Sequence, residues 1–237
     1  AYMFYSATAL QNLDVSNWDT SNVTDMSYLF SNTWVLNDID VSNWDTSNVT
    51  DMQSMFAYAE HLTTLDTSKW DTSKVTNMSS MFNGANRLTT VNVGNWDTGN
   101  VTDMNHMFYA ANALTALDVS KWDTSSVTDM SFLFNSVWLV TELDVSNWNT
   151  SKVTDMQNMF AYTEQLTALD TSKWDTSNVI NMSGMFVGDF SLKTLDVSNW
   201  NTSNVTSMYD MFDGAAALTA LDVSKWDTSK VGNMQFM

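Results

Sequence analysis

The stretch Leu13–Met26, LDVSNWDTSNVTDM, decides the fold, because nearly the same fourteen letters return eight more times before the chain ends. The interval from one copy to the next is 26 residues throughout. A fixed period of roughly 20 to 50 residues is typical of a solenoid, whose units stack on their neighbours instead of closing separate cores. The copies are marked by Trp18, Trp44, Trp70, Trp96, Trp122, Trp148, Trp174, Trp200 and Trp226. We therefore predict a single elongated domain over residues 1–237, built from about nine coils.

The repeat runs into both ends of the chain. Met3 and Phe4 match Met55 and Phe56, and Met237 stands at the position of Met211. We expect the chain to be a fragment of a longer array without its own caps, with export and anchoring signals outside it. No run of about 18 apolar residues is present, so membrane insertion is not expected.

Apolar spacing within one copy predicts two kinds of secondary structure. In the second copy Ile39 and Val41 alternate with polar residues, which is the two-residue period of a strand with one face inward. The polar stretch NWDTSNV follows and can hold a corner through side-chain bonds to the backbone. The next apolar residues, spaced as i, i+3, i+4 and i+7, are Met52, Met55, Phe56 and Ala59. This spacing indicates a short helix, with Thr50 or Asp51 as its N-cap. The fold class is therefore an α/β solenoid of parallel strand, corner and short helix.

Equivalent residues of successive coils should lie above one another, so each position becomes a column. The Trp column is either core or a row of sugar-binding platforms, and we favour core because neighbouring positions are also apolar. Asp19, Asp45 and Asp71 begin a column after Trp in which Asn is the substitute. Asn keeps an acceptor oxygen, so this column should accept backbone hydrogen bonds. No metal or cofactor is expected, and calcium is the alternative. The column Thr20 to Thr228 would be the basis of a less favoured ice-binding hypothesis.

Two tryptophans lie outside the repeated column. Trp34 and Trp138 are 104 residues, or four coils, apart, and the sequence around them repeats as well. A duplicated four-coil block explains this without function, but exposed aromatic groups also bind glycans and proteins. The candidate ligand-binding sets are Trp34 with Tyr28 and Tyr58, and Trp138 with Phe132 and Tyr162.

Charge and residue pattern exclude several classes of function. Nine basic and 27 acidic residues give a net charge of −18, which repels nucleic acid and anionic lipid. His61 and His106 stand at different positions in their copies, so we expect both on the surface. No catalytic group is indicated, and we do not expect an enzyme.

The unit LDVSNWDTSNVTDM…MF…A…L resembles the repeats of BspA-like leucine-rich-repeat surface proteins, and the resemblance covers the whole chain. It implies leucine-rich-repeat-like coils in an exported protein of the bacterial cell surface that is associated with adhesion.

The leading hypothesis is an extracellular adhesin segment, monomeric as a fragment, that binds host mucin, matrix protein, glycans or another bacterial cell. Its extended surface would multiply many weak contacts. The alternative is a passive stalk that projects a binding domain located elsewhere in the parent protein.

Overall fold

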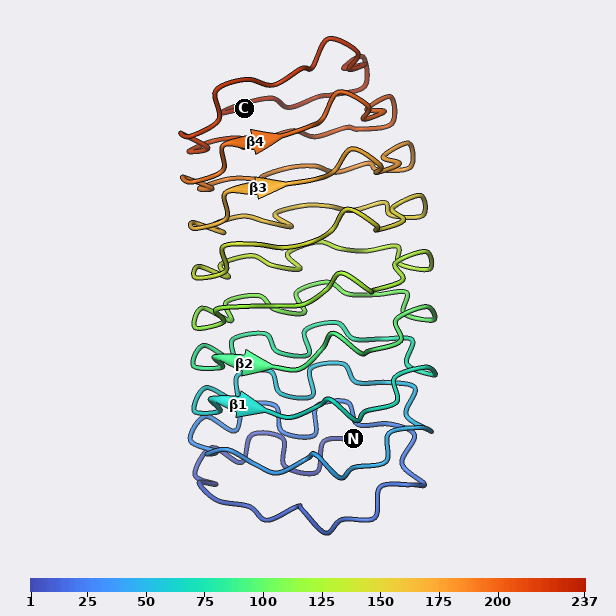
Figure 1. Ribbon diagram of the computed structural model, residues 1–237, viewed down its shortest axis with the longest axis vertical. Coiled ribbons are helices and arrows are strands. Elements are labelled where there is room, and N and C mark those ends of the chain that lie inside the picture. Colours follow the sequence, from blue (N-terminus) through green and yellow to red (C-terminus); the bar gives the residue numbers. More distant parts are fainter.

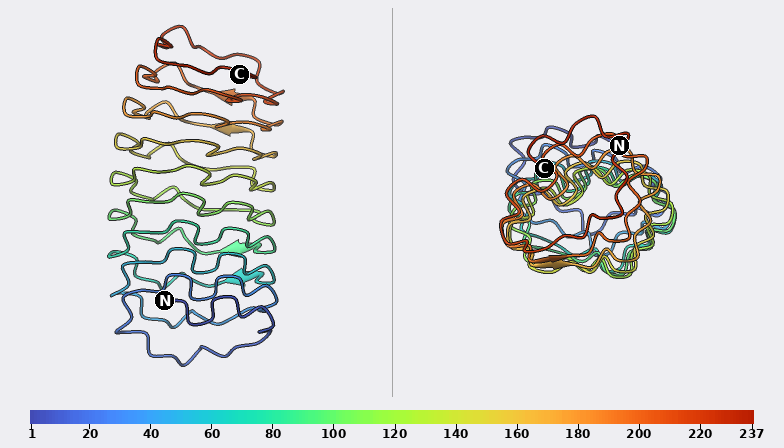
Figure 2. Two further views of the ribbon diagram at one scale, coloured as in Figure 1. Left: turned by 180° about the vertical axis from the view of Figure 1, so that it is seen from behind. Right: turned by 90° about the horizontal axis from the view of Figure 1, so that it is seen from above.

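The computed structural model describes residues 1–237 and shows coils stacked along one axis (Figure 1). We number the coils one to nine from Trp18 to Trp226, so that coil two spans 36–61. Viewed along the stack, successive coils follow nearly the same closed path (Figure 2). The predicted solenoid with a 26-residue repeat is confirmed.

Parallel strands form at the predicted place, but they are very short. β1 (Thr64–Leu65) pairs with β2 (Thr90–Val91), and β3 (Ala168–Leu169) pairs with β4 (Thr194–Leu195). In each strand the first side chain is exposed and the second is buried. A second column of single parallel bridges joins Asp25, Asp51, Asn77, Asp103, Asp129, Asp155, Asn181, Ser207 and Asn233.

The segment predicted as a helix is a series of turns, so the α part of the prediction is wrong. Ser54 and Tyr58 have positive φ angles of 52° and 56°, which an α-helix does not accommodate. The N–H of Met55 bonds to the carbonyl of Met52, three residues back, whereas the N–H of Phe56 bonds to Met81 in the next coil. The side chains predicted to line the helix still face inward, and all four are fully buried: Met52, Met55, Phe56 and Ala59. The structure has no helix that could cross a membrane.

Left-handed residues define two corners in this segment of each coil. The first corner contains Ser54 and its equivalents, and the second contains Tyr58 and its equivalents. At the second corner of coil three the residue is Gly84, with φ of 69°. A Cβ atom on Gly84 would lie 2.5 Å from Cδ1 of Tyr58. The tyrosine ring therefore rests on the backbone of the next coil, at a place that only glycine leaves open.

The Trp column lies in the core. Its seven middle members are at most 4% exposed, and Trp18 and Trp226 in the outermost coils are half-buried. Nε1 of Trp44 donates to the carbonyl of Val15 at 3.0 Å, and the indole stacks on that of Trp70 with an interplanar angle of 3°. The structure therefore agrees with the interpretation of this column as core, and it disagrees with the interpretation as a row of sugar-binding platforms.

Threonines after the Trp are also internal. Thr46 is 1% exposed, and its hydroxyl donates to the carbonyl of Asp71 in the next coil at 2.9 Å. These hydroxyls tie coils together, so the column cannot present an ice-binding face. The expected N-cap is replaced by two other bonds: Thr50 Oγ1 donates to the carbonyl of Thr24, and Asp51 Oδ1 accepts from the N–H of Gln53.

Replacing Gly84 by Ala should destabilise the chain by about 1–2 kcal/mol, because alanine is strained at positive φ and its methyl group would displace Tyr58. Gly232→Ala is the matched control, since a Cβ there meets only the carbonyl of Thr206 at 3.9 Å. Urea unfolding followed by tryptophan fluorescence measures both. Equal stabilities for the two variants would contradict the left-handed corner.

Candidate functional site

Carboxylates of the acidic column after Trp stabilise the turn that follows each Trp. Oδ1 of Asp19 accepts hydrogen bonds from the N–H of Ser21 at 3.1 Å and from its hydroxyl at 2.6 Å. The side-chain hydrogen bond is the main cause that lowers the pKa of Asp19, and serine bonds lower the pKa of Asp45 and Asp71 in the same way. These carboxylates therefore stay charged at neutral pH while they build the turn.

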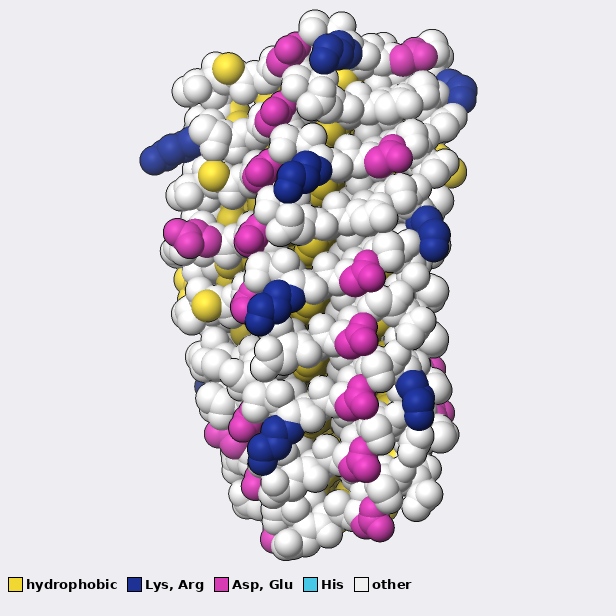
Figure 3. Space-filling model, turned by 45° about the vertical axis from the view of Figure 1, so that its right-hand side comes forward, with side chains coloured by type: hydrophobic (Ala, Val, Ile, Leu, Met, Phe, Trp, Pro, Cys, Tyr) yellow, Lys and Arg dark blue, Asp and Glu magenta, His cyan; other side chains and the backbone are white.

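Lysines on the same face donate hydrogen bonds to asparagine side chains and neutralise little of the acidic charge. Nζ of Lys74 donates to Oδ1 of Asn48 at 2.7 Å, and Nζ of Lys69 donates to Oδ1 of Asn43 at 3.4 Å. Lys74 contributes less to the lowered pKa of Asp45 than the serine bonds do. Figure 3 shows acidic side chains in long rows with lysines spaced widely between them. The rows therefore present negative charge to the solvent.

The acidic column before the inward Met is half-buried. Oδ1 of Asp103 accepts from the N–H of Asn105 at 2.9 Å, and burial raises the pKa of this carboxyl. Burial raises the pKa of Asp155 for the same reason. No group of three or more His, Asp or Glu side chains is arranged to hold a metal ion.

Exposed aromatic side chains gather at and just after the second corner. We call this set the aromatic edge; its members are Trp34, Tyr58, Trp138, Tyr162 and Phe190. Trp34 is 49% exposed and Trp138 is 43% exposed, which is unusual for a residue that is generally mostly buried. Tyr162 lies against Gly188 as Tyr58 lies against Gly84. The packing that holds these two tyrosines is thus repeated four coils apart.

Phe190 is the member that sequence reasoning missed. It stands in the same column as Trp138, two coils further on, and is 53% exposed. Glu164 occupies the coil between them and is also exposed. Reading this column for any aromatic residue, instead of for tryptophan alone, would have found Phe190.

Two of the six predicted site residues belong to separate clusters. Tyr28 is half-buried and stacks on Tyr2, with ring centroids 4.6 Å apart. Phe132 is half-buried and stacks on His106 at 4.4 Å. Both lie at the first corner, and neither forms a ring pair with the nearby tryptophan of its predicted set. His106 is itself half-buried, not a surface residue as expected, and burial lowers its pKa.

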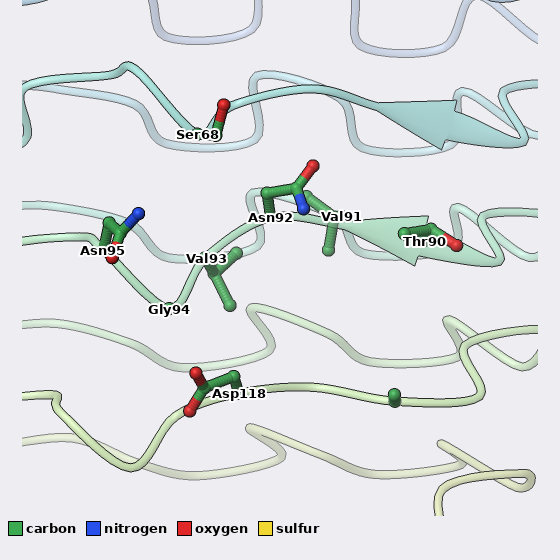
Figure 4. Close-up of a pocket in the computed structure, with 9 residues that line it drawn as sticks. Ser68, Thr90, Val91, Asn92, Val93, Gly94, Asn95 and Asp118 are labelled. Carbon is green, nitrogen blue, oxygen red and sulfur yellow. The ribbon is translucent and has the colours of Figure 1, made fainter.

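The strand face of the middle coils carries two hollows. One hollow of about 340 Å³ lies around Gly94, and Asn92 and Asp118 help to line it (Figure 4). A second hollow of about 440 Å³ shares Ala116 and Asp118 with the first. We call the two together the strand-face groove, which crosses coils three to six.

A family model described as "Mycoplasma protein of unknown function, DUF285" matches residues 1–91, 87–169 and 165–237. The chain belongs to the DUF285 family. No curated protein sequence matches this DUF285 chain significantly.

Among solved structures, the DUF285 chain is similar to an internalin (InlF) from Listeria monocytogenes str. 4b F2365. The two are 13% identical with a TM-score of 0.34, and the match covers 97% of this chain and 86% of the internalin chain. So low a similarity says nothing about what the DUF285 chain binds.

One buried carboxyl of the DUF285 chain has no charged partner. Asp189 is fully buried, and its Oδ1 accepts bonds from the N–H of Thr163 at 2.8 Å and from its hydroxyl at 3.0 Å. Its Oδ2 has no partner, and burial raises the pKa to about 8. Four coils earlier the same two positions are Ala59 and Ala85. The second block therefore has a hydrogen-bonded Thr–Asp pair where the first block has two alanines, and the carboxyl of this pair is protonated at neutral pH.

Asp189 should make the wild-type protein less stable than Asp189→Asn as pH rises from about 4 to about 8. The folded pKa lies above the ordinary value of 3.8, so in this window the folded state keeps a proton that the unfolded state has lost. The difference in unfolding free energy should change by at most about 1.4 kcal/mol per pH unit. Urea unfolding of both proteins between pH 4 and 9 measures it, and His106 cancels because both contain it. Parallel stability curves would contradict the buried, protonated carboxyl.

Proposed function

We propose that this chain is the repeat region of a bacterial cell-surface adhesin, which binds host mucin, extracellular matrix, glycans or other cells through the aromatic edge. The observation that carries the proposal is the exposure of Trp34 and Trp138 in a fold whose other tryptophans serve the core. Exposed aromatic groups on a rigid scaffold are typical anchors of binding surfaces.

Duplication of the aromatic edge supports a multivalent role. Trp34 and Tyr58 recur as Trp138 and Tyr162, four coils away, which is about 19 Å at the usual spacing between strands. Two weak contacts on one rigid body raise avidity without further contacts. The BspA-like resemblance of the repeat supports an extracellular location at the cell surface.

Removing both tryptophans should abolish adhesion with little loss of stability. Beads coated with the wild-type chain or with Trp34→Ala/Trp138→Ala would be tested on immobilised mucin, matrix proteins and cultured cells. We expect at least about a tenfold loss of bound beads, because aromatic anchors commonly contribute 2 kcal/mol or more. Asn86→Ala is the control, since Asn86 is exposed in the same column. Equal adhesion of the double variant and wild type, or no adhesion by either, would contradict the proposal.

A passive stalk remains the second candidate, because the columns outside the aromatic edge are occupied by structural bonds. Deleting residues 34–137 removes four coils and keeps the 26-residue register. An adhesin should keep weak adhesion through Trp138 and lose avidity relative to the full chain. A stalk should give no adhesion by either purified chain. Bead adhesion under flow, with folding checked by tryptophan fluorescence, distinguishes the two outcomes.

A further inference from the structure

The first hollow of the strand-face groove lies where coil four departs from the repeat. Asn92 and Gly94 stand where coil eight has Asp196 and Ser198. A Cβ atom on Gly94 would lie 2.6 Å from Oδ2 of Asp118. The carboxylate of Asp118 thus lies over Gly94, where a serine side chain would otherwise stand.

Carboxylates line the groove. Asp118 borders both hollows, and Glu142 and Asp144 line the second hollow. Oδ1 of Asp118 is engaged by Ser120, so its Oδ2 is the oxygen left for a ligand. The bonds from Ser120 are the largest causes that lower the pKa of Asp118, and Lys121 contributes less. Neither hollow is lined by a Lys or Arg, and the negative charge there is therefore largely uncompensated.

Two exposed apolar side chains lie close in sequence to residues that line the groove. Trp138 and the adjacent Leu139 are both exposed, at 43% and 39%. Glu142 follows Trp138 by four residues, so their Cα atoms are at most about 14 Å apart. A polypeptide segment longer than the groove can therefore also reach these apolar groups.

We infer that the strand-face groove binds a cationic polypeptide segment that carries arginine or lysine. Stacked carboxylates repel each other, and a cation placed between them is attracted by both. The inference rests on the proposed adhesive function and names the chemistry of its partner.

Other occupants fit the groove less well. An anionic partner is repelled by a chain of net charge −18. A glycan would find polar groups but no aromatic platform, because no aromatic residue lines either hollow. A metal ion lacks a suitable group of three ligands.

Binding is tested with the whole chain, labelled with ¹⁵N, and a nine-residue peptide of alternating Arg and Ser. We expect a saturable shift of the Gly94 amide, whereas Gly188 and Gly214, at the second corners of coils seven and eight, stay unchanged. Peptides of alternating Glu and Ser, and the neutral sugar cellohexaose, should cause no shift. A Gly94 shift with cellohexaose and not with the Arg peptide would overturn the inference in favour of a glycan site. Uniform shifts along the chain would overturn it in favour of diffuse attraction.

Two pairs of charge-removing substitutions separate the groove from the acidic surface as a whole. Glu142→Gln/Asp144→Asn should weaken peptide binding by about tenfold or more, because both carboxylates line the groove. Asp170→Asn/Asp196→Asn also removes two charges, outside the groove, and should weaken binding by less than about twofold. Equal losses would overturn the inference. Asn preserves the corner bonds, as Asn149 shows by accepting from the N–H of Ser151.

Restoring the repeat gives the sharpest test. Asn92→Asp/Gly94→Ser gives coil four the residues that coil eight has as Asp196 and Ser198, displaces the Asp118 carboxylate from its place over Gly94, and makes the chain more acidic by one charge. The groove inference expects weaker peptide binding, by about threefold or more, whereas attraction by charge alone expects equal or tighter binding. Equal or tighter binding would therefore overturn the inference. Because the purified chain is used, peptide binding without bead adhesion would reject only the adhesive function.

Discussion

Backbone hydrogen bonds between coils, at a fixed offset of one repeat, constrain everything else in this chain. The N–H of Thr50 bonds to the carbonyl of Thr24, and the N–H of Thr76 bonds to Thr50, at 2.8 and 2.9 Å. Buried backbone groups must find partners, and in this fold many partners lie on the neighbouring coil. One inserted residue would shift every later position out of register. The unbroken 26-residue interval and the columns of like residues both follow from this.

Equivalent residues stack in columns, so like charges and like rings lie above one another. Hydrogen bonds within each coil offset the repulsion between the like charges. Asp40 faces repulsion from Asp66, yet the bonds from Ser42 outweigh it and keep the pKa low. Indoles gain from stacking, and most also donate through Nε1 to a backbone carbonyl of the preceding coil, as Trp70 does to Val41. A residue that stabilises one coil therefore stabilises its equivalents, which explains why the repeat is so uniform.

The sequence predicts the solenoid, its period and its inward residues, because burial follows from spacing alone. It does not predict the turns, since Met52, Met55, Phe56 and Ala59 can face inward either from a helix or from two left-handed corners. Glycine at the corner positions would have indicated left-handed turns. Ser54 and Tyr58 are not glycines, however, and only some coils, such as the third with Gly84, have glycine at a corner. The duplication also does not indicate Phe190 as a member of the aromatic edge, because the other four-coil block has no phenylalanine at the equivalent position. Ring contacts such as Phe132 on His106 depend on side-chain direction, which spacing does not give.

Departures from the repeat are tolerated because each coil touches only its neighbours, so a local change has a local cost. The duplicated blocks show this directly: Ala59 and Ala85 in one become Thr163 and Asp189 in the other, and the two new groups bond each other. Asn92 and Gly94 line a hollow in coil four, while coil eight keeps the consensus. A uniform scaffold thus leaves single coils free to acquire sites of their own. The proposed binding surfaces lie in the coils that differ, while the repeated residues keep those coils in place.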